Sequence, residues 1–86
     1  MVVVPNPIHQ GIALVTLNGI SNRKCMISVV DVLGREVVAP TRLERGTGSS
    51  LVTPVNLSGL SSGTYVVVAQ IGAEMLLKTV TVVNGE

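Results

Sequence analysis

The sequence predicts an all-β protein, a small immunoglobulin-like antiparallel β-sandwich of about seven strands. Apolar residues make up 47% of the 86 residues and aromatic residues only 1%, so the core must be built from Val, Ile, Leu and Met. A Val-rich apolar set favours strands over helices. The apolar runs are short and regularly interrupted by turn residues, and no segment shows a helical period bounded by caps. The length allows one core, so residues 1–86 are expected to form a single domain.

The first half of the chain predicts four strands, at residues 2–4, 11–17, 25–32 and 35–39. The first is expected to be a short edge strand, because it runs into the corner formed by Pro5, Asn6 and Pro7, where prolines cannot donate to a ladder. Apolar residues alternate in the second and third strands, and the third should turn its odd-numbered residues to the core. Residues 31–34 have the composition of a type I turn. The fourth strand is expected to end at Pro40.

The second half predicts three more strands, at residues 51–57, 64–71 and 74–83. Residues 41–50 are polar and Gly-rich, so we expect the most mobile loop there. Pro54 indicates an edge position for the fifth strand, and residues 58–63 form a compact turn region. In the sixth strand, alternate positions from Tyr65 to Ile71 should share one face. Gly72-Ala73 fits a two-residue hairpin loop.

Composition and spacing give no candidate for catalysis or metal binding. The formal charge is +1 and the basic residues are scattered; with one Tyr and no Trp or Phe, nucleic-acid binding is disfavoured. His9 has no second histidine for a metal pair, and we expect it to be a solvated turn residue. Cys25 cannot form an internal disulfide and is expected to be a buried free thiol. We therefore predict no enzyme, no cofactor and no metal site.

Two residues have both a structural and a functional interpretation. Tyr65 should pack its ring in the core and donate its hydroxyl to a nearby turn, although a recognition role at the end of the sandwich is the alternative. Lys78 is a lone charge in an apolar last strand. It is either an outward-facing edge charge that blocks aggregation or a contact for a receptor, and the pattern does not separate the two.

Four segments occur in an order that resembles a known family. The order is Val4-Pro5-Asn6-Pro7, then residues 27–37 around Asp31, then residues 57–68 with Gly63-Thr64-Tyr65, then residues 78–83 beginning with Lys78. In this order the chain resembles the C-terminal sorting domains of the type IX secretion system of Bacteroidetes-type bacteria, in their larger type A class. Val4 and Val30 stand where that family often has an aromatic residue.

The resemblance implies an export label. Such a domain ends a secreted cargo protein, is recognised in its folded form by an outer-membrane translocon and is typically removed by a sortase-like protease at the cell surface. The implied partners are therefore the translocon, the protease and the N-terminal cargo domain. The implied location is the periplasm in transit and then the cell surface or the extracellular space. We assign recognition, as a hypothesis, to residues that could equally determine the fold: Pro5, Asn6, Pro7, Gly63, Tyr65 and Lys78.

Two other functions stay open at this point. The first is an immunoglobulin-like adhesive or spacer module of a cell-surface enzyme, which would have no transport role. The second is a carbohydrate-binding module, which usually presents a row of exposed aromatic residues where this chain has only Tyr65. The oligomeric state is not predicted.

Overall fold

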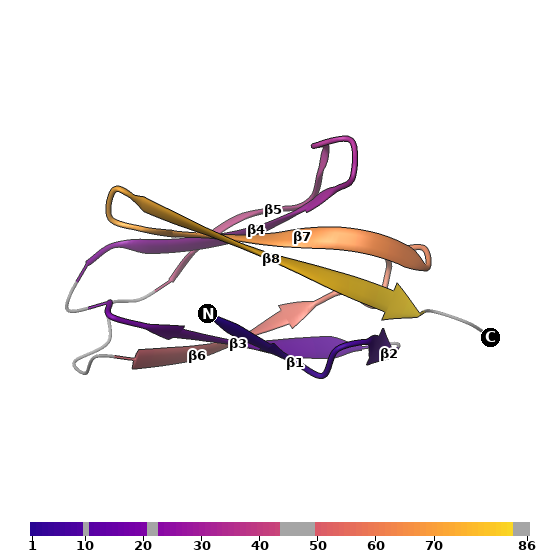
Figure 1. The fold of residues 1–86 in the computed structure, drawn as a ribbon, viewed down its shortest axis with the longest axis horizontal. Helices are drawn as coiled ribbons and strands as arrows, with labels where there is room; N and C mark the ends of the chain where they lie inside the picture. The colour runs from indigo at the N-terminus through magenta and orange to yellow at the C-terminus, as the bar shows by residue number, and fades with distance from the viewer. Residues whose placement is uncertain (10, 21–22, 44–49, 84–86) are drawn as a thin grey trace.

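The protein folds into two β-sheets packed face to face (Figure 1). The structure, a computed structural model, describes residues 1–9, 11–20, 23–43 and 50–83. Sheet A has three strands in the order β1-β3-β6, and sheet B has five in the order β2-β8-β7-β4-β5. The strands are β1 (Val2–Val4), β2 (Ile8–His9), β3 (Ile12–Asn18), β4 (Cys25–Asp31), β5 (Glu36–Leu43), β6 (Ser50–Asn56), β7 (Gly63–Ile71) and β8 (Glu74–Val83).

Alternation along the strands forms the core between the sheets. Sheet A turns Ala13, Val15 and Leu17 of β3 inward, and all three are fully buried. Sheet B contributes alternate residues of three strands, as the two-residue period of a strand requires. They are Cys25, Ile27 and Val29 of β4, Tyr65, Val67, Ala69 and Ile71 of β7, and Val80 and Val82 of β8. This confirms the expected core faces of the third and sixth predicted strands. The described residues include no helix long and apolar enough to cross a membrane.

The structure confirms the predicted small β-sandwich and adds one short strand, β2, which makes the only parallel pair among the described strands. β2 was not predicted, because two residues between Pro7 and Gly11 are too short to show a period. Ile8 and His9 pair in parallel with Val82 and Val83 at the outer edge of β8. Every other strand pair in the two sheets is antiparallel.

Strand β5 does not end at Pro40 as expected but continues to Leu43. β5 is the edge strand of sheet B, so a proline can lie in it without leaving a second neighbouring strand unpaired. The pairing with β4 also shifts register twice, between Ile27 and Val29 and between Val29 and Val30. The first shift accommodates one extra residue of β5, because Ala39 and Pro40 together lie opposite the single residue Ser28. Of the predicted loop at 41–50, residues 41–43 therefore belong to β5 and Ser50 to β6, and residues 44–49 lie outside the described part of the chain.

The two hairpins of sheet B form as the sequence predicts. The amide of Gly34 donates to the carbonyl of Asp31 at 3.0 Å, and Gly34 has a φ of +84°. In the second hairpin, Ile71 pairs with Glu74 across two residues, and Gly72 has a φ of +59°. Glycine is the residue that adopts such angles without strain from a Cβ atom. Pro54 lies in edge strand β6, as expected.

Candidate functional site

The first candidate segment, Pro5-Asn6-Pro7, carries the chain from sheet A to sheet B. It joins β1 to β2, which belong to different sheets. Asn6 Oδ1 accepts a hydrogen bond from the backbone amide of Thr81 at 3.3 Å. Strand β2 pairs with β8 only from Val82 onward, and Thr81 is the residue before Val82. The Asn6 side chain therefore binds an edge amide of β8 that β2 does not cover. Asn6 is therefore part of the sheet edge as well as an exposed residue of the corner.

Tyr65 locks the turn that precedes β7. Its side chain is only 8% exposed, and its hydroxyl donates to the carbonyl oxygen of Ser61 at 2.6 Å. This confirms the expectation that the ring packs in the core while the hydroxyl reaches a nearby turn. Gly63 begins β7 opposite Val82. A Cβ at Gly63 would lie 3.9 Å from the Tyr65 ring, which is an ordinary contact, so crowding does not explain this glycine.

Asp31 organises the third segment, the β4–β5 turn. Its Oδ1 accepts hydrogen bonds from the amides of Leu33 and Arg35, both at 2.9 Å, and its Oδ2 accepts one from Arg35 Nε at 2.8 Å. The hydrogen bond from the Arg35 amide is the main reason that the pKa of Asp31 is lowered. Asp31 is also the cross-strand partner of Tyr65. The sequence did not predict Asp31 and Arg35 as site residues, although both lie in a segment that carries the family resemblance. The Asp31–Gly34 spacing of the turn is the signal that could have indicated them.

These three segments lie at the same end of the sandwich, which we call the motif end and define as residues 5–7, 31–35 and 61–65. Here β4 ends, β7 begins and β8 reaches its last residues (Figure 1). A hollow of about 550 Å³ separates the β4–β5 turn from the turn before β7. At its rim stand Val32 and Leu33, which are 71% and 75% exposed and are the most exposed large apolar residues described. The structure thus brings Pro5, Asn6, Pro7, Gly63 and Tyr65 to one end.

Lys78 lies apart from the motif end. It pairs with Val67, two residue pairs along β8 from the Val80–Tyr65 pair. Because cross-strand partners share a face and Val67 is buried, Lys78 is on the core-facing side of β8, yet its side chain is exposed at the sheet edge. The expectation of an outward-facing charge was therefore wrong about the face and correct about the exposure.

The remaining chemical candidates from the sequence are not gathered into a site. His9 is exposed, as expected, but it lies in β2 and not in a turn. Cys25 is a buried free thiol that donates to the carbonyl of Arg23 at 3.4 Å. Within the described ranges, no three His, Cys, Asp or Glu residues are close enough together to hold a metal ion.

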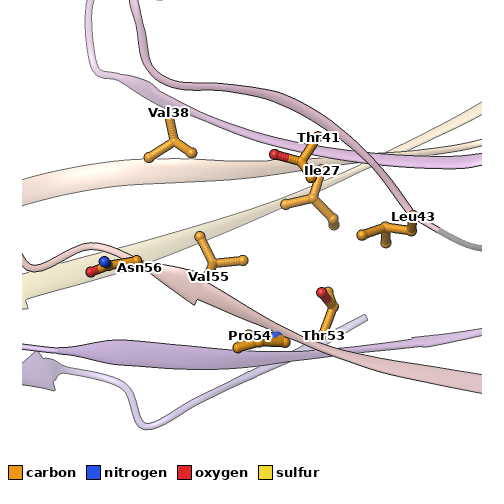
Figure 2. Close-up of a pocket in the computed structure, with 8 residues that line it drawn as sticks. All are labelled: Ile27, Val38, Thr41, Leu43, Thr53, Pro54, Val55 and Asn56. Atoms are coloured by element: carbon orange, nitrogen blue, oxygen red, sulfur yellow. The ribbon is translucent and has the colours of Figure 1, made fainter.

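A second hollow lies where the two sheets part, between the edge strands β5 and β6 (Figure 2). It has a volume of about 220 Å³ and is lined mainly by apolar side chains, among them Val38, Leu43 and Val55. Thr41 also lines it and is exposed although its partner Ile27 is buried. The cause is that sheet A stops at β6 and leaves the inner face of β5 uncovered.

The fold is thus a two-sheet β-sandwich that has its motif segments at one end. Comparison with protein families matches residues 2–83 to the secretion system C-terminal sorting domain. The chain belongs to this family, whose members are the C-terminal sorting signals of type IX secretion cargo. The domain therefore directs export across the outer membrane to the cell surface or extracellular space. No curated protein and no solved structure gave a significant match.

Proposed function

We propose that this sorting domain is read as a folded body by the outer-membrane translocon, through the motif end and Lys78. The residues assigned to recognition are Pro5, Asn6, Pro7, Gly63, Tyr65 and Lys78. We further propose that the domain has no catalytic role and that a sortase-like protease removes it from its N-terminal cargo after transport.

One observation supports folded recognition above all others. The polar atoms of the family's motif residues are hydrogen-bonded inside the domain: Asn6 to the amide of Thr81, and Tyr65 to the carbonyl of Ser61. The first of these bonds joins residues 75 positions apart, so it forms only when the sandwich does, whereas the second is local and joins residues four positions apart. A translocon that contacts the motif end would therefore distinguish a completed domain from an unfolded chain. The exposed Val32 and Leu33 at the same end offer apolar contact area for such binding.

The test fuses residues 1–86 behind an inert reporter that carries its own periplasmic signal, in a type IX-competent host. The parent fusion should reach the cell surface, and its reporter should lack residues 1–86 when its mass is measured. Asn6→Ala and Leu33→Ser should keep most of the folded fraction, because both side chains are exposed, and should export less reporter than the parent. Met75→Ser is the control: Met75 is 61% exposed and lies on β8 at the other end of sheet B.

Three outcomes would contradict parts of the proposal. If export of every variant follows its folded fraction measured by circular dichroism, the motif residues determine the fold and are not read directly. If Met75→Ser reduces export as much as Leu33→Ser, recognition does not involve the motif end. If the exported reporter keeps residues 1–86, proteolytic removal is wrong for this domain.

A further inference from the structure

The outer face of sheet A carries no charge and is mainly apolar at its centre, with the polar residues Asn18, Ser50 and Asn56 at its two ends. The strands β1, β3 and β6, all of whose residues are described, contain no Asp, Glu, Lys, Arg or His. Cross-strand pairing places Val4, Leu14 and Pro54 in one row on this face and Val2, Thr16 and Val52 in the next. The large apolar residues among them are 44–56% exposed. All described charged side chains lie on sheet B or in the connections next to it.

The edges of both sheets are protected against the addition of another strand. β1 has only three residues, and β5 contains Pro40 and two register shifts. β8 carries the core-side Lys78 and is covered by β2 at Val82 and Val83. Short edges, prolines, bulges and inward charges are the features by which natural sheets avoid edge pairing.

The fourth edge, β6, is protected by Pro54. The amide of Leu57 donates to the carbonyl of Gly11, one residue pair beyond the β3–β6 register. In an antiparallel ladder the backbone groups of alternate residues point to the same side, so Val55 and Thr53 face β3 and Pro54 faces the open edge. A strand added to β6 would find no amide at the centre of that edge. Contact with a partner is therefore not expected to occur by strand addition at a sheet edge.

The size and chemistry of the sheet A face restrict its partner. β3 and β6 have seven residues each and β1 has three, so at about 3.4 Å per residue and about 4.8 Å between strands the face measures about 280 Å². Two such faces would bury about 560 Å², well under the 1,200–2,000 Å² or so of a stable interface, so a second copy of this chain would not stay bound. The face also has no basic or aromatic side chain with which to anchor in a lipid headgroup region. The small area and the lack of charge of the sheet A face suit a transient contact with an uncharged protein surface.

We propose that the outer face of sheet A makes a transient contact with an uncharged, aliphatic protein surface of the secretion apparatus. This inference rests on the proposed recognition of the folded domain and adds a second surface to it, separate from the motif end. Because the contact involves no charge, its strength should change little with salt concentration.

The test uses the reporter fusion with Leu14→Lys, which places a charge at the centre of the face. Leu77→Lys is the matched control, since Leu77 is 64% exposed on the outer face of sheet B. Leu14→Lys should reduce export about tenfold, the effect of one well-placed contact residue, while Leu77→Lys should leave export within about twofold of the parent. If Leu14→Lys lowers the folded fraction, Val52→Thr replaces it, because Val52 is exposed and threonine keeps the β-branched shape.

Each outcome decides the inference. Export by a folded Leu14→Lys domain at the parent level overturns it, and so does an equal loss with Leu77→Lys. Light scattering that shows a dimer abolished by Leu14→Lys would identify a second copy as the occupant. Sedimentation of the domain with neutral phosphatidylcholine vesicles, lost in Leu14→Lys, would identify lipid; either result refutes the proposal. If the parent fusion itself stays in the periplasm, the recognition proposal fails as well.

Discussion

Removal of the Tyr65 hydroxyl tests whether this residue supports the fold or is read by a partner. In the parent, the hydroxyl donates to the Ser61 carbonyl at 2.6 Å in a partly buried position. Tyr65→Phe keeps the ring and removes one hydrogen bond, which costs about 0.5–1.5 kcal/mol of unfolding free energy. For a domain of this size, 1 kcal/mol corresponds to about 4–8 °C in melting temperature.

Tyr65→Ala measures how much the buried ring contributes to the unfolding free energy. The ring is 8% exposed among buried aliphatic side chains, so its truncation should cost about 3–5 kcal/mol. This is a large part of the 5–10 kcal/mol or so expected for a small domain. We therefore expect Tyr65→Phe to fold at 25 °C and Tyr65→Ala to be largely destabilised.

The assay is urea unfolding followed by far-ultraviolet circular dichroism, because Tyr65 is the chain's only aromatic residue and its fluorescence disappears in both variants. The slope of unfolding free energy against urea should be the same for the parent and Tyr65→Phe, which shows that the folded states are equally compact. An unchanged midpoint for Tyr65→Phe would refute the structural assignment of the hydroxyl. A folded Tyr65→Phe domain that is not exported would show that the translocon contacts the hydroxyl.

Three further substitutions have defined outcomes. Gly72→Ala should lower the unfolding free energy by about 1–2 kcal/mol, because a residue at φ +59° would strain its backbone and its Cβ would lie 3.2 Å from Arg23 Cδ; Gly59→Ala, where nothing lies within 4 Å, should change little, and equal effects would contradict this. Asp31 has a lowered pKa in the folded state, so its contribution to stability is present above its ordinary pKa of about 3.9 and is lost as the pH falls through the lowered value. Thermal melts at several pH values should therefore show a smaller loss below about pH 4 for Asp31→Asn than for the parent, and parallel curves would disprove the link. Lys78→Ala should leave the melting temperature nearly unchanged, because the side chain is exposed; if reporter export also stays normal, Lys78 has no recognition role.

Most of the sandwich could be predicted from the sequence because the alternation of apolar residues and the positions of the turn residues indicate the same strand boundaries. Cys25, Ile27 and Val29 alternate with partly exposed residues and are buried as predicted. The Asp31–Gly34 turn and the Gly72 hairpin follow from local composition, since a glycine at positive φ is a local requirement. These features depend on neighbouring residues, which a sequence displays directly.

The features that could not be predicted depend on tertiary pairing. β2 exists because β8 lies beside it, and nothing in Ile8-His9 shows this partner. Pro40 is tolerated because β5 is an edge strand with a bulge, and neither property can be read from a proline alone. The face of Lys78 was missed because its exposure results from the sheet edge and not from the strand period.

The candidate site was predicted in part. The sequence order indicated which segments matter, and the structure placed Asn6, Gly63 and Tyr65 at one end of the sandwich. The hydrogen bond from the Thr81 amide to Asn6 joins residues 75 positions apart, so no local pattern contains it.

The position of β8 has a consequence for the order of events in export. β8 supplies the buried Val80 and Val82 and pairs with both β7 and the early strand β2, so the sandwich cannot close until residues 74–83 have been synthesised. A chain that stops early or is trimmed before residue 74 lacks the buried Val80 and Val82 and the strand that pairs with β7. If the translocon recognises the folded domain, as we propose, a cargo protein can be exported only after its last strand has been synthesised.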